Sequence, residues 1–171
     1  LKEWKSPEYF NAPLITEEKQ MEVEQKSYDD GLRERGVKIH KFFEHINSAE
    51  QAKKIANDYL GDDAQQVTEL LKDDEFKKVF SDSARSEVPL IGYIDGKIVS
   101  RRVDKLLVED GKVYVIDFKT TKNIPDDIPT AYVNQMRVYN QLVSQIYPDK
   151  EIVTQILWTS KPKLVTVPLD S

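Results

Sequence analysis

The pattern of hydrophobic and polar positions divides the chain into a helical half followed by a strand-rich half. In the first half, apolar residues recur at the three- and four-residue spacing of amphipathic helices. The helices expected there are Tyr28–Ile46, Ser48–Leu60, Asp63–Leu71 and Asp74–Phe80. Ser48 and Gln51 match a capping box at the start of the second helix, and Gly61 supplies its stop signal. Residues 1–27 show no sustained period and are expected to form an extended lead-in.

Alternating and β-branched runs predict strands in the second half of the chain. The expected elements, in order, are the strands Glu87–Ile94, Lys97–Val108 and Lys112–Thr121, a helix from Pro129 to Tyr147, and the strands Ile152–Trp158 and Lys163–Val167. Hairpin turns are expected at Asp95-Gly96 and Asp110-Gly111. Because a helix separates the third strand from the fourth, these two strands are expected to run parallel. The predicted fold is α/β, a single domain over residues 28–171 with a mixed sheet of about five strands flanked by helices.

Two charged residues distinguish the third predicted strand. A strand places Asp117 and Lys119 on one face, while Tyr114, Ile116 and Phe118 point to the other face, which is expected to be the core. A carboxylate at a strand end binds hard divalent cations, and a lysine two residues later orients a water or offsets charge on a phosphate. An isolated Asp-x-Lys pattern is more often a solvated charge pair, and the pattern alone leaves this alternative open.

Asp104 lies among apolar residues of the second predicted strand. Pairing about the Asp110-Gly111 turn places Asp104 opposite Asp117, so two carboxylates are expected side by side, as in metal-binding pairs. The alternative is a surface aspartate paired with Arg102 or Lys105, and it is favoured when Asp104 is taken alone.

Polar residues also interrupt two apolar helical stripes. His40 follows Gly36 by one turn, a spacing that lets a ligand approach the ring, although a lone histidine on a core stripe is more often satisfied by a hydrogen bond. Gln135 and Tyr139 share the inward face of the helix expected from Pro129 to Tyr147 and could face the same site. A glutamine at the edge of the core is an equally good interpretation of Gln135.

Composition narrows the class of protein. The 171 residues, 39% of them apolar, suit one globular domain, and the chain's start at Leu1 with a polar opening indicates a fragment of a longer polypeptide. The chain has no cysteine, which excludes a disulfide framework and a Cys-ligated iron–sulfur cluster and favours the cytoplasm. No stretch approaches the roughly twenty apolar residues of a membrane span. The net charge of −5 argues against a freestanding basic nucleic-acid binder, but a site that collects cations is itself acidic.

Five separated motifs occur in an order that resembles the RecB-like branch of the PD-(D/E)XK nucleases. They are Gly36-x-x-x-His40, Glu87, Val103-Asp104, Ile116-Asp117-Phe118-Lys119-Thr120 and Gln135-x-x-x-Tyr139. Near the end, Ile146-Tyr147-Pro148 and Leu157-Trp158-Thr159 look like the nuclease domain at the C-terminus of AddA-type helicase–nuclease subunits. The resemblance covers roughly residues 31–168 and implies a restriction-endonuclease-like core.

The resemblance also implies a role for each motif residue. The metal would be held by His40, Asp104, Asp117 and the backbone carbonyl of Phe118, and Lys119 would serve the attacking water. Gln135 and Tyr139 match the helix motif that supports the site and contacts the DNA backbone, and Glu87 matches a glutamate near the site. Carboxylates outnumber nitrogen ligands and no thiolate competes, so we expect Mg²⁺ or Mn²⁺. The four cysteines that hold an iron–sulfur cluster in some relatives are missing here.

Taken together, the motifs predict a metal-dependent DNA exonuclease of double-strand-break repair and recombination, in the bacterial cytoplasm at the nucleoid. The expected partners are a single DNA strand produced by a helicase, the helicase domain of the same chain and a second, AddB-like subunit, with no membrane. The alternative is a non-catalytic nuclease-like module that binds DNA or supports a helicase partner. Loss of a metal ligand would be its signature, and all of the expected ligands are present.

Overall fold

The computed structural model describes residues 30–46, 48–121, 123–159 and 161–169, so the expected lead-in over residues 1–27 lies outside the described part. The elements are α2 (Asp30–His45), α3 (Ala49–Leu60), the 3₁₀ helix η1 (Gly61–Asp63), α4 (Ala64–Leu70), α5 (Asp74–Val79), β1 (Ala84–Ile94), β2 (Lys97–Val108), β3 (Lys112–Lys119), α6 (Thr130–Ile146), β4 (Glu151–Trp158) and β5 (Lys163–Thr166). Within these ranges no helix combines the length and the apolar character needed to cross a membrane.

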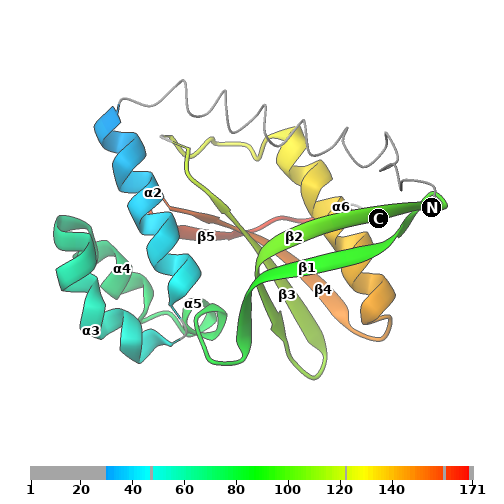
Figure 1. The fold of residues 1–171 in the computed structure, drawn as a ribbon, viewed down its shortest axis with the longest axis horizontal. Coiled ribbons are helices and arrows are strands. Elements are labelled where there is room, and N and C mark those ends of the chain that lie inside the picture. Colours follow the sequence, from blue (N-terminus) through cyan, green and yellow to red (C-terminus); the bar gives the residue numbers. More distant parts are fainter. Residues whose placement is uncertain (1–29, 47, 122, 160, 170–171) are drawn as a thin grey trace, which may run out of the picture.

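One mixed sheet organises the domain, with the strands in the order β1-β2-β3-β4-β5 (Figure 1). The first three strands form an antiparallel meander, β3 and β4 run parallel, and β5 is antiparallel to β4. Helix α6 connects β3 to β4, because two parallel neighbours need a crossover rather than a tight turn. The predicted α/β class, the five strands and the parallel pair are thus confirmed.

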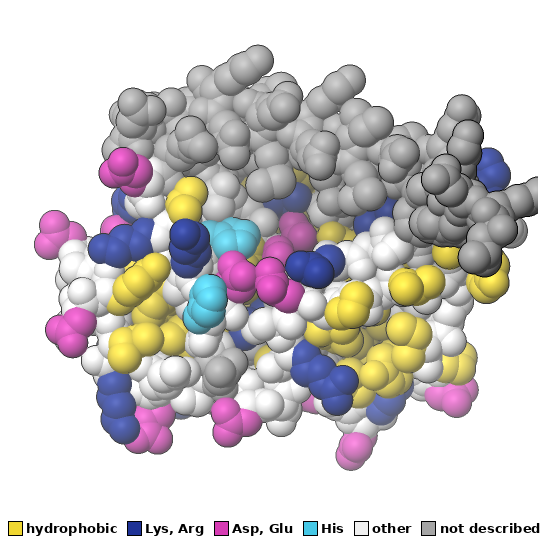
Figure 2. Space-filling model, in the orientation of Figure 1, with side chains coloured by type: hydrophobic (Ala, Val, Ile, Leu, Met, Phe, Trp, Pro, Cys, Tyr) yellow, Lys and Arg dark blue, Asp and Glu magenta, His cyan; other side chains and the backbone are white. Residues whose placement is uncertain are grey.

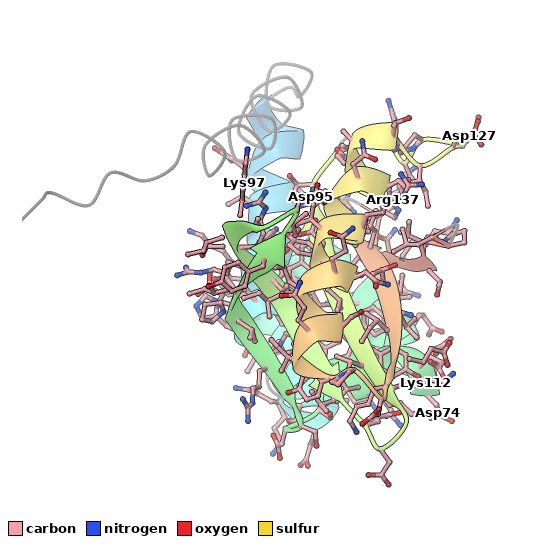
Figure 3. All side chains as sticks on the ribbon, turned by 90° about the vertical axis from the view of Figure 1, so that its right-hand side faces the viewer. Asp74, Asp95, Lys97, Lys112, Asp127 and Arg137 are labelled. Atoms are coloured by element: carbon pink, nitrogen blue, oxygen red, sulfur yellow. The ribbon has the colours of Figure 1, made fainter. Side chains whose placement is uncertain are left out.

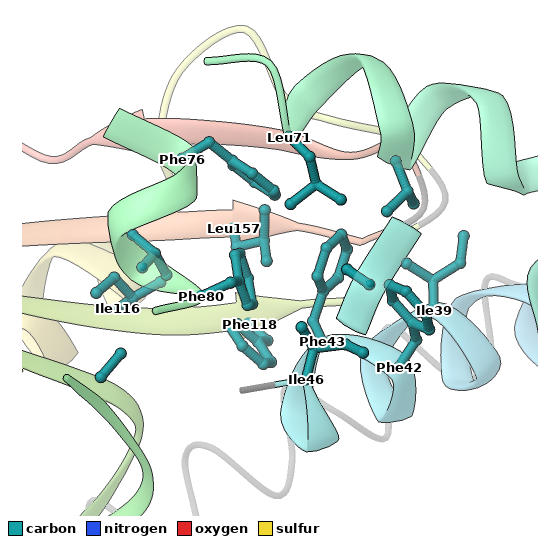
Figure 4. Packing of buried hydrophobic residues seen from close by; sticks show 14 of the residues in the cluster. Ile39, Phe42, Phe43, Ile46, Leu71, Phe76, Phe80, Ile116, Phe118 and Leu157 are labelled. Atoms are coloured by element: carbon teal, nitrogen blue, oxygen red, sulfur yellow. The ribbon is translucent and has the colours of Figure 1, made fainter. Parts of the chain in front are cut away.

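Helices cover both faces of this sheet. On one face lie α2 to α5. The rings of Phe43, Phe76 and Phe80, the last of which directly follows α5, have centroids 4.9 to 5.7 Å apart and pack with Phe118 of β3 (Figure 4). Helix α6 lies across the other face, as the view turned by 90° shows (Figure 3). Its buried residues are Tyr132, Met136, Tyr139, Leu142 and Val143. Strand β3 is consequently buried on both faces, so the face that carries Asp117 and Lys119 also belongs to the interior.

The last turn of α6 departs from its predicted stripe. The apolar period of the helix predicts that Ile146, seven residues after Tyr139, faces inward, but Ile146 is 49% exposed. The contact with the sheet is made here by Gln145, whose Oε1 accepts from the N–H of Tyr93 at 2.9 Å and whose Nε2 donates to the Tyr93 carbonyl at 2.7 Å. Because β1 is an edge strand, these two bonds cover backbone groups that would otherwise face solvent. Gly92 permits the approach, since a Cβ there would lie 2.6 Å from Gln145 Oε1.

Candidate active site

Asp117 and Lys119 lie at the carboxyl end of β3, beneath α6. Their side chains are 7% and 12% exposed, and Lys119 Nζ is 3.0 Å from Asp117 Oδ2. This ion pair is therefore withdrawn from water, unlike the solvated charge pair that the isolated pattern would favour. Burying two charges is costly unless further polar contacts support them, so the surroundings of the pair must supply those contacts.

Helix α6 supplies them. Lys119 Nζ donates to Gln135 Oε1 at 2.8 Å and lies 4.3 Å from the centroid of the Tyr132 ring. Gln135 Nε2 donates to the Tyr139 hydroxyl oxygen at 2.9 Å, and that oxygen is 3.5 Å from Asp117 Oδ1. Asp117, Lys119, Gln135 and Tyr139 thus form a closed ring of polar contacts, here called the polar ring. Gln135 uses both ends of its amide in this ring, which orients the group.

The sequence pattern does not identify Tyr132 as a residue of the site, although its ring contacts Lys119. It lies on the apolar stripe of α6 and reads there as a core residue, yet its ring faces the Lys119 ammonium at a distance typical of a cation–π interaction. A signal was available, because Tyr132 and Gln135 are three residues apart and therefore share a helix face. The sequence does not show which side chain on this face contacts Lys119, because that depends on how α6 crosses β3.

One carboxylate oxygen in the polar ring is incompletely satisfied. Asp117 Oδ2 is buried and accepts no hydrogen bond from an N–H or hydroxyl group of the described ranges, although the Asp117 side chain shares a hydrogen bond with the Asp104 carboxyl. Its contact with Lys119 is an attraction between charges whose geometry is not that of a hydrogen bond. A buried carboxylate oxygen in this state is unusual, and such oxygens suit a hard cation as a partner.

Asp104 reaches the same region from β2. The pairs Leu106↔Val115 and Lys105↔Ile116 establish the predicted register, which brings Asp104 opposite Asp117. Asp104 Oδ2 accepts from the N–H of Phe118 at 2.6 Å. Burial raises the pKa of Asp104 well above its usual range, and the neighbouring Asp117 carboxylate raises it further, while the Phe118 N–H opposes the shift. The neighbourhood of the two aspartates is therefore confirmed.

An irregularity in the β1–β2 hairpin, at which β2 changes the face of the sheet that its side chains occupy, helps to direct the side chain of Asp104. This irregularity is called the step below. Val103 packs with the residues beneath α6, whereas Leu107 packs with those beneath α2 to α5. Residues four apart in a regular strand share a face, so the strand must change face between these two positions. Opposite this step on β1, Glu87 has a φ of 50°, which is unfavourable for a residue other than glycine. Such strained positions are concentrated at functional sites.

His40 and Glu44 approach the region from α2. The His40 ring meets the Phe118 ring edge to face at 5.2 Å between centroids, and its Nε2 is 3.9 Å from Glu44 Oε2. Burial lowers the pKa of His40, with the negative charges of Asp117 and Glu87 acting in the opposite direction. A lowered pKa favours the neutral imidazole, the form that binds metals.

Glu44 joins Glu87 at the rim of the site. Burial raises the pKa of Glu44, and a hydrogen bond with the Glu87 carboxyl raises it further. Figure 2 shows acidic side chains gathered beside histidine, where α2 meets the hairpin. Glu44 follows His40 by one helical turn, but as a polar residue beside an apolar stripe it gave no sign of a site role in the sequence.

The predicted site residues are thus brought together to different degrees. Asp117, Lys119, Gln135 and Tyr139 are linked in the polar ring, and Asp104 lies beside them. His40 packs against the Phe118 ring, while Glu87 is hydrogen-bonded to Glu44 and interacts with the charge of His40. Across the described ranges, no three His, Asp or Glu side chains are spaced to hold a metal ion. The Lys119 ammonium and the Phe118 N–H instead lie against the carboxylate oxygens of Asp117 and Asp104. The ligand set that includes the Phe118 carbonyl stays a prediction.

Comparison with known proteins gives distant structural likenesses. No family model matches the chain, and no curated protein matches it. Ten chains of solved structures match. A protein from Eubacterium rectale named "Putative exonuclease" shows a TM-score of 0.44 and 18% identity over 65% of this chain and 46% of its own. The protein SSO0001 shows a TM-score of 0.38 and 14% identity over 72% of this chain and 64% of its own. The chain therefore spans less than two thirds of either protein.

Proposed function

We propose that this domain is a deoxyribonuclease that hydrolyses phosphodiester bonds with the help of a divalent cation. The observation that carries the proposal is the polar ring, which holds a lysine and an aspartate in a buried place beside a second aspartate, Asp104. The motif order that resembles the RecB-like nucleases supports the same conclusion. Preorganised charges in a site of low exposure are the usual means by which enzymes stabilise developing charge.

The cation would be Mg²⁺ or Mn²⁺, held by Asp104 and Asp117 with His40 and the Phe118 carbonyl. The buried, incompletely satisfied Asp117 Oδ2 supports this assignment, as does the oxygen-rich donor set. When bound, such a cation lowers the pKa of a water and offsets charge on the phosphoryl oxygens.

The chain's own groups would act mainly by position. Lys119 would donate to a water or to a phosphate oxygen, and its ammonium would offset negative charge there. Gln135 and Tyr132 hold that ammonium in place, while Tyr139 links Gln135 to Asp117. Because these partners come from one rigid helix, the reacting groups lose little freedom when substrate binds.

The biological setting that we propose follows from the motif resemblance. The domain would act as an exonuclease on single strands that a helicase produces, joined to a helicase domain of the same chain and an AddB-like subunit. It would serve double-strand-break repair and recombination in the bacterial cytoplasm, without a membrane and without an iron–sulfur cluster.

End-labelled single-stranded DNA tests the proposal. We expect cleavage with Mg²⁺ or Mn²⁺, none with excess chelator, and binding without turnover in Ca²⁺. Asp117→Asn should remove cleavage, whereas Asp127→Asn, in the exposed segment before α6 (Figure 3), should leave it unchanged. Full digestion in excess chelator would contradict the requirement for a metal.

A second candidate is a non-catalytic module that binds DNA or supports a helicase. The observation in its favour is that the described residues offer no three acidic or histidine side chains at metal-binding spacing. This candidate predicts that the wild type and Asp117→Asn bind single-stranded DNA equally and that neither cuts it with any of these cations.

A further inference from the structure

We propose that Ser86 and Lys105 form a clamp that sets the position of α2, and with it His40 and Glu44, against the strands that carry Glu87 and Asp104. The catalytic meaning of the clamp rests on the proposed function, but its structural part stands on the contacts alone. Ser86 and Lys105 would be positioning residues, since their role is to place other groups.

Both clamp residues donate to backbone carbonyls at the end of α2. Lys105 Nζ donates to the Ile46 carbonyl oxygen at 2.9 Å, and Ser86 Oγ donates to the Glu44 carbonyl oxygen at 3.0 Å. Ser86 and Lys105 are direct partners across the β1–β2 ladder. Two neighbouring strands, β1 and β2, therefore each form a hydrogen bond with the last turn of α2.

The physical basis is the set of carbonyls that a helix leaves open at its C-terminus. The last four carbonyl groups have no partner within the helix, and a cation at that end also interacts favourably with the helix dipole. The bonds from Ser86 and Lys105 meet both needs without using water. They also end α2 at a defined place on the sheet.

Burying the ammonium group of Lys105 costs free energy, and packing alone would not require a charged residue at this position. Its side chain is 0% exposed, and besides the Ile46 carbonyl its Nζ faces the Phe80 ring at 5.3 Å. A buried ammonium loses its hydration, and an apolar side chain of similar volume would often serve stability as well or better. What the lysine adds is direction, because hydrogen bonds have a fixed geometry and apolar contacts do not.

The clamp lies next to the candidate active site. One residue beyond Ser86 on β1 is Glu87, and one residue before Lys105 on β2 is Asp104. On α2, Glu44 carries one of the clamped carbonyls, and His40 lies one turn before it. Helix α2 is also held by apolar packing, by the hydrogen bond between Glu44 and Glu87, and by Arg35, whose Nε donates to Asp63 Oδ1 at 2.6 Å. The two clamp bonds differ from these contacts because they join the backbone of α2 to the strands, and they therefore set which turn of α2 faces the carboxylates.

The experiment compares four variants of the chain. Lys105→Met and Ser86→Ala each remove one clamp bond, whereas Ser86→Thr keeps the hydroxyl. Lys150→Met is the matched control, because Lys150 Nζ also donates to backbone carbonyls, those of Glu109 and Asp110 in the turn between β2 and β3, and makes no hydrogen bond to α2 within the described ranges. Hydrogen exchange of the α2 amides is followed by mass spectrometry, Mn²⁺ affinity by calorimetry, and cleavage of single-stranded DNA by kcat and KM.

We expect faster exchange in residues 38–46 for Lys105→Met and Ser86→Ala, with Ser86→Thr and Lys150→Met close to the wild type. Mn²⁺ should bind about 10-fold more weakly to the two clamp variants, the usual effect of removing a group that orients a ligand. The kcat should fall with KM for DNA unchanged, since the clamp places catalytic groups and does not contact the DNA.

Wild-type exchange in α2 of both clamp variants would overturn the inference, and so would a uniform rise in exchange across the whole domain. If Lys105→Met fails to fold, the contrast between Ser86→Ala and Ser86→Thr decides the matter. A wild type that neither binds Mn²⁺ nor cuts DNA would overturn the proposed function, and the exchange measurement would still test the clamp.

Discussion

At Lys119 a carboxylate, an amide oxygen and an aromatic face surround one ammonium group. Asp117 attracts it, Gln135 orients it and Tyr132 covers it. This combination compensates for burying the ammonium in a place with little water, because an opposite charge and a hydrogen bond replace its hydration. Substituting Lys119 and Asp117 one at a time therefore distinguishes the contribution of each residue to cleavage and to metal binding.

Lys119→Met should lower cleavage of single-stranded DNA by at least about 100-fold, a typical effect of removing a group that positions a water or stabilises developing charge. Its Mn²⁺ affinity should be unchanged or slightly higher, since a nearby positive charge opposes cation binding. Asp117→Asn should lose both cleavage and Mn²⁺ binding. Calorimetric titration beside a nuclease assay makes the comparison, and cleavage by Lys119→Met at the wild-type rate would reduce the ion pair to a structural feature.

Lys105 leads to a prediction about pH. Burial lowers the pKa of Lys105 from 10.5 to about 8 in the folded protein, although the Glu44 carboxylate partly opposes the shift. Between these values the unfolded chain binds more protons, so the contribution of Lys105 to the free energy of unfolding increases with pH. The cost of the buried charge is complete below about pH 8 and is gone above 10.5, a difference of about 3 kcal/mol.

Urea unfolding of the wild type and Lys105→Met from pH 7 to 10.5, with chelator present, isolates this contribution. The stability of the wild type relative to the variant should rise across that window, because methionine does not titrate. A difference that stays constant with pH would mean that Lys105 keeps an ordinary pKa in the fold.

Among the elements, α6 does the most to connect packing with chemistry. Its buried residues fill the core beneath it, Gln135 and Tyr139 complete the polar ring, and Gln145 closes part of the β1 edge. The close approach of α6 to β1 depends on the absence of a side chain at Gly92, where a Cβ would also lie 2.9 Å from Leu142 Cδ2.

Gly92→Ala should therefore destabilise the domain by about 1–3 kcal/mol, the usual cost of forcing extra volume into a packed contact. Gln145→Ala removes one of the two clashing groups, so Gly92→Ala should cost less in that background, with the clash against Leu142 remaining. Denaturant unfolding of the two single variants and the double variant tests this coupling. Additive effects would show that the alanine is accommodated without displacing Gln145.

In the whole molecule, the candidate site lies where the two core clusters meet across the sheet. His40 and Glu44 come from the side of α2, while Lys119, Gln135 and Tyr139 lie on the side of α6. A cation bound by ligands from both sides would tie the layers together. A ligand that binds only the native state stabilises it by an amount that rises with the logarithm of ligand concentration once that concentration exceeds Kd.

Mn²⁺ at 100 times its Kd should accordingly raise stability by about 2.7 kcal/mol, which corresponds to about 5–10 °C in Tm for a domain of this size. Differential scanning calorimetry with and without Mn²⁺ measures the shift, and excess chelator should reverse it. Asp117→Asn should show no shift, while Asp127→Asn should match the wild type. An equal shift in Asp117→Asn would place the bound cation elsewhere.

The sequence by itself determined the elements and much of their pairing. Ser48 accepts from the Gln51 N–H at 3.1 Å and Gly61 takes a φ of 58°, as the capping pattern predicts. The turn chemistry also set the hairpin register that brings Asp104 beside Asp117. These features depend on residues close in sequence or on one turn, and local geometry is what a periodic pattern records.

Only the tertiary structure decided what surrounds those residues. The face of β3 that carries Asp117 and Lys119 is interior because α6 lies across it, and a strand pattern does not say which face a distant helix will cover. In the sequence, Tyr132 has the pattern of a core residue, Glu44 that of a helix-surface residue, and Lys105 that of an ordinary strand lysine. Only the packing of helices and sheet places Tyr132 against Lys119, Glu44 against Glu87, and Lys105 against the end of α2. Their roles depend on how helices and sheet approach one another, which is set by the packing of side chains that are far apart in sequence.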